Sequence, residues 1–172
     1  MSRQDELYEQ ASTTLGGALE RLARAYEAEP DKCRDLLQEI HIALWRSFEK
    51  FDGRCSLRTW VYRVAHNVAV SLITRRRTNK QAFLSLDEVD VSSIAVDAEV
   101  DIDRKRSFER LLAVIKELRP LDRQVILLYL EGLDATSIGE ITGFPSSYVT
   151  TKVHRIKKTL SRRFQKGNSN VS

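Results

Sequence analysis

Two runs of helical hydrophobic periodicity, separated by a segment without any, restrict this chain to two helical units joined by a connection. Apolar side chains recur every three or four residues in both runs, which places them on one face of each helix. The segment between the runs is long for a loop within one compact domain. The sequence therefore predicts an all-α fold in four parts: a small helical domain at 1–78, a flexible acidic linker at 79–102, a second helical domain at 103–166 and a disordered tail at 167–172.

The charged residues are segregated along the chain, although the net charge is only +4. Residues 54–80 carry seven Lys and Arg and no Asp or Glu, and the residues after Glu140 repeat this pattern. Between the two basic segments, residues 81–103 carry seven acids and no base. Two basic segments predict two contacts with a polyanion such as nucleic acid, and the acidic connection between them would not bind it.

Several classes of protein are excluded. No run of about 18 apolar residues exists, and the polar N-terminus does not resemble a secretory signal. Two cysteines are too few for a disulfide framework, so we expect free thiols in a cytoplasmic protein without direct membrane insertion. The candidate metal ligands, which are Cys33, Cys55, His41, His66 and His154, lack close pairing, so we expect no metal. The sequence has no Gly-rich phosphate loop and no nucleophile–base pair, so we expect neither a cofactor nor an enzyme.

The most specific motif lies at residues 132–160, where a short helix, a turn at Gly143-Phe144-Pro145 and a second helix form a helix-turn-helix. In the second helix, Val149, Val153, Ile156 and Leu160 share one face and are expected to pack inward. The opposite face carries hydrogen-bonding groups for base edges and cations for phosphates. A helical bundle with a solvated polar face is the alternative, but it does not explain seven cations without an acid. We expect this face to bind DNA through Ser146, Ser147, Tyr148, Thr151, Lys152, Arg155 and Lys158.

The expected helix at 31–50 has apolar residues on two faces. Leu36, Ile40 and Leu44 form the core face, whereas Ile42 and Trp45 lie on the opposite face among polar and acidic residues. This pattern predicts a protein-docking patch. The alternative is that the long first helix covers these two side chains.

The third expected helix, capped by Ser56 and ending near Arg76, mixes aromatic and basic residues. Its expected core face is Leu57, Val61, Val64, Val68 and Leu72, and its expected surface includes Thr59, Arg63, His66, Asn67, Val70 and Thr74. Aromatic rings among cations suit single-stranded nucleic acid, because rings stack on bases while cations follow the phosphates. For Trp60 and Tyr62, stacking on bases and packing in the core remain equally open.

Two of these segments resemble parts of a known family. Residues 35–77, DLLQEIHIALWRSFEKFDGRCSLRTWVYRVAHNVAVSLITRRR, resemble the second conserved domain of bacterial RNA polymerase sigma factors, most closely the extracytoplasmic-function (ECF) group. Residues 118–160, LRPLDRQVILLYLEGLDATSIGEITGFPSSYVTTKVHRIKKTL, resemble their fourth domain. With flanking helices the resemblance spans about residues 5–165, in the domain order of that group and without a middle domain.

The resemblance implies an alternative sigma factor built from a sigma-2-like helical bundle and a sigma-4-like helix-turn-helix. It implies that Asp35, Gln38, Glu39, Ile42 and Trp45 bind the clamp helices of the largest subunit of core RNA polymerase. It assigns the promoter −10 element to Arg54, Ser56, Thr59, Trp60, Arg63, His66, Asn67, Arg75, Arg76 and Arg77, and the −35 element to the outward face of the helix-turn-helix. Further implied partners are the flap of the second-largest subunit and an anti-sigma factor. The linker is implied to thread near the polymerase active site.

Departures from the family pattern leave the promoter sequence open. Tyr148 is bulkier than the usual residue at the start of the −35 helix, Thr150 stands where a Lys is common, and His66 stands where an Arg is common. A helix-turn-helix regulator with an N-terminal dimerisation or signal module is the alternative function. It requires neither the aromatic and basic third helix nor the Ile42 and Trp45 patch. An enzyme acting on nucleic acid is disfavoured because the basic segments contain no carboxylate.

Overall fold

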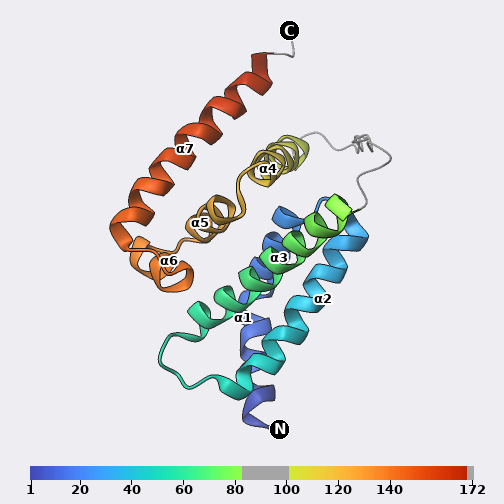
Figure 1. The fold of residues 1–172 in the computed structure, drawn as a ribbon, viewed down its shortest axis with the longest axis vertical. Helices are drawn as coiled ribbons and strands as arrows, with labels where there is room; N and C mark the ends of the chain where they lie inside the picture. Colours follow the sequence, from blue (N-terminus) through green and yellow to red (C-terminus); the bar gives the residue numbers. More distant parts are fainter. Residues whose placement is uncertain (83–100, 170–172) are drawn as a thin grey trace.

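The computed structural model describes residues 1–82 and 101–169, and within them the chain is all helical (Figure 1). The N-terminal helices are α1 (Arg3–Tyr26), α2 (Pro30–Ser47), the 3-10 turn η1 (Phe48–Lys50) and α3 (Leu57–Ala82). The C-terminal helices are α4 (Asp101–Lys116), α5 (Pro120–Leu130), α6 (Ala135–Thr142) and α7 (Ser146–Ser169). The all-α fold and the order of the helices predicted from the sequence are confirmed.

Two helices are longer than predicted. The sequence placed the end of the third helix near Arg76, but α3 continues to Ala82, because no Gly or Pro interrupts it and its residues tolerate helix. Both ends of the expected linker, 79–82 and 101–102, are therefore helical, and residues 83–100 lie outside the described residues. Similarly, α7 includes 167–169 of the expected tail, and 170–172 lie outside the described residues.

Local capping explains several helix ends. Ser2 and Asp5 form a reciprocal capping box at the start of α1, in which each side chain accepts a backbone N–H of the other residue. Pro30 begins α2, where the missing N–H costs nothing. The Asp134 carboxylate accepts the backbone N–H of Ser137 at 2.8 Å and begins α6. Gly143, with φ of +82°, ends α6 in the left-handed conformation.

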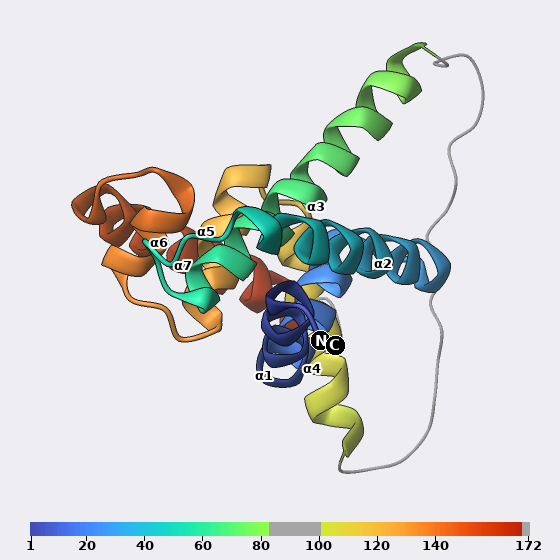
Figure 2. The same ribbon diagram turned by 90° about the horizontal axis from the view of Figure 1, so that it is seen from below.

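The helices pack as two groups that also contact each other. The group α1, α2 and α3 encloses fully buried side chains such as Leu19, Ile40 and Val61, and the group α4 to α7 encloses others such as Ile115 and Ile126. Between the groups, α1 packs against α4, and α3 packs against α5 and α6. Figures 1 and 2 show α3 lying between α2 on one side and the helix-turn-helix on the other. The contact between the groups positions the surfaces described below.

The buried face of α3 differs from the predicted one. Of the expected core residues, Val61 is fully buried, whereas Leu57, Val64, Val68 and Leu72 are only partly buried. The deepest additional residues are Thr59, Tyr62, Ala65, His66 and Ala69. The prediction treated α3 as packed on one side, but the C-terminal helices cover part of its other side.

The helix-turn-helix depends on a glycine at a close contact. A Cβ atom at Gly139 would lie 2.5 Å from the carbonyl oxygen of Phe144, in the turn that leads to α7. Replacing Gly139 by alanine should therefore lower the free energy of unfolding by about 2 kcal/mol, because backbone must move to relieve the clash. Urea unfolding measures this.

Gly16→Ala is the matched control for this prediction. Gly16 lies in α1, and a Cβ atom there would meet no neighbouring atom within 4 Å. Alanine at this position should raise the free energy of unfolding by about 0.5 kcal/mol through its higher helix propensity. Equal effects of the two substitutions would contradict the proposed role of Gly139.

Candidate nucleic-acid and protein-binding surfaces

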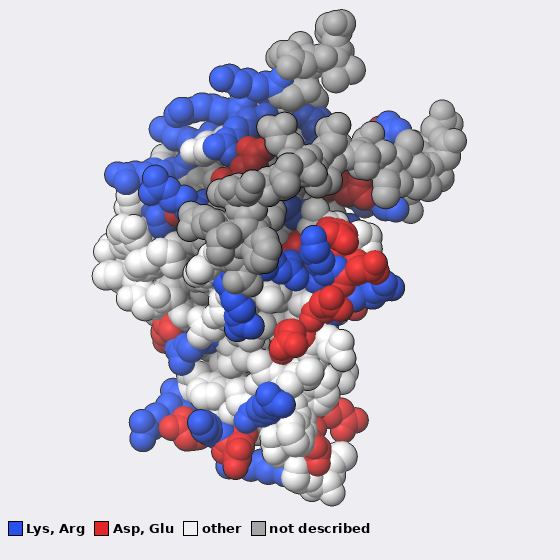
Figure 3. Space-filling view, turned by 45° about the vertical axis from the view of Figure 1, so that its right-hand side comes forward, with Lys and Arg blue, Asp and Glu red and all other residues white. Residues whose placement is uncertain are grey.

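The first candidate surface lies on α7, the second helix of the helix-turn-helix. The four predicted inward residues, Val149, Val153, Ile156 and Leu160, are all buried, which confirms the predicted orientation of the helix. Most of the predicted outward set is exposed: Ser146, Ser147, Tyr148, Thr151, Arg155 and Lys158. Figure 3 shows Lys and Arg side chains gathering at the end of the molecule where the C-terminal half of α7 lies.

An acidic residue of α5 neutralises part of this cationic face. An open groove between α7 and the start of α5 is lined by Tyr148, Lys152 and Arg155 together with Asp122. Lys152 forms an ion pair with Asp122, and its ammonium also lies 5.4 Å from the centre of the Tyr148 ring. The hydrogen bond from Lys152 to Asp122 raises the pKa of Lys152. Among the described residues Arg155 has no ion pair, so its guanidinium is available to a ligand.

The second candidate surface surrounds the loop between η1 and α3. Gly53, with φ of +76°, turns this loop, and the Arg54 side chain, 90% exposed, forms an ion pair with Asp52 at 3.0 Å. Ser56 caps α3 by accepting the backbone N–H of Thr59 at 3.0 Å. An open pocket is lined by residues 52–56, Trp60, Arg63 and Glu140.

The structure gives different environments to Trp60 and Tyr62, for which the sequence left open whether they stack on bases or pack in the core. Tyr62 is 2% exposed and belongs to the core. Trp60 is only partly buried, and its indole N–H donates to the Ser47 hydroxyl at 2.9 Å. Its ring lies edge-on to Phe51, with 5.4 Å between ring centres. Trp60 is therefore held firmly while one part of it reaches the pocket.

Two residues predicted on this surface are buried instead. Thr59 is 5% exposed and accepts a hydrogen bond from the Ser56 hydroxyl at 2.9 Å. His66 is 1% exposed, and its Nδ1 lies 3.0 Å from the Tyr26 hydroxyl. The prediction of surface positions for Thr59 and His66 is wrong, because α3 is covered on two sides.

The remaining residues of the predicted −10 set lie along α3. Arg63 is partly buried and donates to the backbone carbonyl of Glu140 at 2.7 Å. Asn67 and Arg75 are exposed, Arg76 forms an ion pair with Glu27, and the side chain of Arg77 lies outside the described residues.

The third candidate surface is the exposed face of α2. All five predicted residues are exposed there: Asp35, Gln38, Glu39, Ile42 and Trp45. The first helix borders Trp45 without covering it. The indole N–H of Trp45 donates to Asp5 at 3.0 Å, yet 43% of the residue stays exposed. This hydrogen bond, with those from Ser2, lowers the pKa of Asp5 to about 2.

The α2 face and part of the α3 surface meet in one groove. Asp35, Glu39 and Ile42 line one side of it, and Asn67 and Arg75 line the other. A protein bound to α2 would therefore lie directly beside nucleic acid bound along α3.

Burial of His66 predicts a specific loss of stability in acid. Burial lowers the pKa of His66 to about 3, from 6.5 for an ordinary histidine. As the pH falls below about 6.5, the unfolded chain takes up a proton that the folded protein does not, so stability present above this pH is lost towards pH 3. We expect the free energy of unfolding to fall by up to about 1.4 kcal/mol per pH unit over this range.

Urea unfolding at several pH values between 7.5 and 5 measures this slope. It is compared between the wild type, His66→Asn and a control variant, His154→Asn, which replaces an exposed histidine. Only His66→Asn should flatten the pH dependence. An equally steep slope in that variant would contradict the assignment to His66.

Comparison with known proteins identifies the family. Sigma-70 region 2 matches residues 13–79, and sigma-70 region 4 matches residues 108–160, so the two matches cover more than two thirds of the chain. The ECF RNA polymerase sigma factor SigX of Bacillus subtilis is 25% identical over 80% of this chain and 73% of its own length. The ECF RNA polymerase sigma-E factor of Haemophilus influenzae is 29% identical over 76% of this chain and 74% of its own length. The chain belongs to the ECF group of the sigma-70 family.

Solved structures show the same fold for this ECF sigma factor. RpoE of Bartonella quintana, in complex with the anti-sigma factor NepR, has a TM-score of 0.71 and 19% identity, and the match covers 92% of this chain and 96% of RpoE. CnrH, in complex with the cytosolic domain of CnrY, has a TM-score of 0.64 and 17% identity, and the match covers 92% of this chain and 87% of CnrH.

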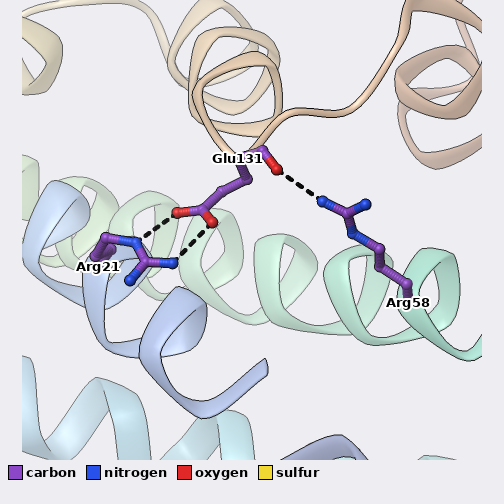
Figure 4. Close-up of polar contacts among 3 residues, drawn as sticks. All are labelled: Arg21, Arg58 and Glu131. Carbon is purple, nitrogen blue, oxygen red and sulfur yellow. Dashed lines mark hydrogen bonds and ion pairs between the residues drawn. The ribbon is translucent and has the colours of Figure 1, made fainter. Parts of the chain in front are cut away.

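The residues that join the two domains of this ECF sigma factor were not predicted from the sequence. Figure 4 shows Glu131, after α5, between Arg21 of α1 and Arg58 of α3. These arginines are 110 and 73 positions apart from Glu131 in sequence, and no local pattern signals their contact.

Neither a metal site nor a membrane span is found in the part of the chain that the structure describes. Within residues 1–82 and 101–169, no three His, Cys, Asp or Glu side chains are grouped to hold a metal ion. Over the same residues, no helix is both long enough and apolar enough to cross a membrane.

Proposed function

We propose that this alternative sigma factor binds core RNA polymerase through the exposed face of α2 and directs initiation at promoters with −10 and −35 elements. The observation that carries the proposal is that sigma-70 regions 2 and 4 occur in one chain, each with an exposed basic surface. A regulator with a helix-turn-helix alone would not contain region 2. In this proposal the protein binds polymerase and promoter DNA and catalyses no reaction. It acts in the cytoplasm, together with the polymerase.

The pocket beside the η1–α3 loop is proposed to capture unpaired bases of the −10 element. Trp60 is fixed by its bond to Ser47 and offers a stacking surface, while the exposed Arg54 can follow the phosphates. Stacking contributes about 1–3 kcal/mol per base, which offsets the cost of a few kcal/mol for unstacking each step. Asn67, Arg75, Arg76 and Arg77 would extend this contact along α3.

The exposed face of α7 is proposed to read the −35 element in the major groove. Arg155 has no ion pair within the described residues and can make a bidentate contact with a guanine. Ser146, Ser147 and Thr151 supply hydrogen bonds to bases or phosphates. Tyr148 lies against Phe144, with 4.9 Å between ring centres, and is exposed enough to contact the DNA as well.

The proposed protein partners follow from the same surfaces. The acidic and apolar face of α2 would bind the clamp helices of the largest polymerase subunit, and the C-terminal domain would bind the flap of the second-largest. An anti-sigma factor is a further proposed partner, since the structural neighbour RpoE was solved in complex with one.

Fluorescence of 2-aminopurine in the −10 non-template strand tests this function. The promoter is first selected by sequencing the transcripts that the reconstituted holoenzyme makes from genomic DNA. We expect the fluorescence to rise when holoenzyme is added, because the base unstacks, and to rise much less with Trp60→Ala. The proposal would be contradicted if holoenzyme raised the fluorescence no more than core polymerase alone does.

A further inference from the structure

A cavity of about 370 Å³ lies between the two domains, separate from the pockets described above. Helices α1, α3, α4 and α5 all contribute to its lining. Most of the wall is apolar and is formed by Leu22, Phe108, Leu111, Leu112, Ile115 and Leu127. Small-molecule sites in proteins are typically cavities of about 300–1,000 Å³ with apolar walls and a few polar groups. This cavity has the size and the lining of such a site.

The charged side chains at the cavity are paired with each other. Arg21 and Glu131 both line it, and the guanidinium makes two hydrogen bonds to the carboxylate, at 2.7 and 2.9 Å (Figure 4). The Tyr62 hydroxyl, which belongs to the lining as well, interacts with Arg58. A charged ligand would lose its hydration here without meeting an uncompensated opposite charge. The cavity therefore favours a neutral ligand.

One polar atom in the lining lacks a partner. His66 lines the cavity and is 1% exposed, and its Nδ1 lies 3.0 Å from the Tyr26 hydroxyl. Its other ring nitrogen, Nε2, makes no hydrogen bond with any residue that the structure describes, yet it is not sealed off from the surface. The small accessible part of the ring therefore includes Nε2 and faces the cavity. A buried polar atom in this position favours a ligand that supplies its hydrogen bond.

The state of the His66 ring selects the ligand group. Burial lowers the pKa of His66 to about 3, so the ring is neutral near pH 7, with one nitrogen as donor and the other as acceptor. The Tyr26 hydroxyl can serve either form of Nδ1, which leaves Nε2 as acceptor or donor. A ligand hydroxyl can donate to Nε2 or accept from it, and so fits both forms. A carbonyl group would fit only one of them.

We infer that the cavity between the two domains binds a neutral small molecule with an apolar body and one hydroxyl group, which pairs with Nε2 of His66. The ligand would contact α1 and α3 on one side and α4 and α5 on the other. Because it binds the folded protein, it would raise the midpoint of thermal unfolding. Binding at this cavity is independent of the proposed contacts with polymerase and DNA.

Nitrogen-15 NMR of the full-length protein, titrated with 4-butylphenol, tests the site. The signal of His66 Nε2, assigned by its absence from His66→Asn, should shift and saturate with a Kd on the order of 0.1–1 mM, as expected for a ligand of this size. Butylbenzene has the same apolar body without the hydroxyl. At equal concentration it should not produce this shift, because it cannot form the hydrogen bond.

Leu111→Trp tests whether the probe binds in the cavity. Leu111 is a partly buried wall residue on α4, and a larger side chain there would fill the space that the probe needs. Calorimetry should show binding of 4-butylphenol weakened at least about tenfold. Leu121→Trp is the matched control on α5, where the leucine is 50% exposed and lies outside the cavity. It should bind the probe within twofold of the wild type.

The outcomes decide both the site and the class of ligand. No saturable shift of Nε2 with 4-butylphenol would overturn the site, and so would equal affinities in Leu111→Trp and the wild type. Equal shifts with 4-butylphenol and butylbenzene would overturn the assigned hydroxyl contact. Circular dichroism verifies that Leu111→Trp is folded, and if it is not, the Nε2 shift in the wild type decides alone.

Discussion

Trp45→Ala should weaken binding to core RNA polymerase about thirtyfold. The side chain is 43% exposed beside Ile42, and a tryptophan at the centre of a docking patch typically contributes about 2 kcal/mol or more. Fluorescence anisotropy of labelled sigma factor titrated with core measures the loss. The fold should persist, because the substitution removes one exposed ring and its hydrogen bond to Asp5.

Tyr148→Ala is the matched control for Trp45. Tyr148 is 45% exposed, in the C-terminal domain on the face proposed for −35 DNA. Its removal should leave the affinity for core within twofold of the wild type. If Trp45→Ala also stayed within twofold, the α2 face would not be the docking surface.

Arg155→Ala should reduce the preference for promoters with an intact −35 element over promoters with a mutated one at least tenfold. A bidentate arginine–guanine contact contributes about 1–3 kcal/mol of discrimination. Because no ion pair holds Arg155 among the described residues, its loss should leave the stability of the helix unchanged. Transcription from promoters with an intact and a mutated −35 element measures the effect. The variant should lose the preference for the intact element.

Lys157→Ala is the control on the same helix. Lys157 carries the same charge two residues further along α7, but it contacts Tyr129 of α5 on the other side. It should retain the preference for the intact −35 element. Equal losses in the two variants would indicate general electrostatic attraction, and the assigned face of α7 would be wrong.

Prediction from the sequence succeeded where a helix packs on one side. Along α7, one apolar stripe predicted four buried residues, and all four are buried, because a single layer of neighbours covers that face. The exposure of Ile42 and Trp45 was predicted equally well, since both lie on α2 opposite the core face.

Prediction from the sequence failed where burial depends on distant segments. His66 and Thr59 were placed on the surface because periodicity reveals one packed face, and the second side of α3 is covered by helices far along the chain. Likewise, the pairing of Lys152 with Asp122 and of Arg21 with Glu131 joins residues that no local pattern connects. The charge segregation indicated where cations gather, but not which of them are already paired.

Run-off transcription with purified core RNA polymerase tests most directly whether this protein directs promoter-specific initiation. The template is a promoter selected from genomic DNA, and the reaction is run with and without this protein. We predict a discrete transcript that requires the protein and is lost when the −10 element is mutated. A transcript that forms equally well without the protein, or no discrete transcript on any template, would contradict this function.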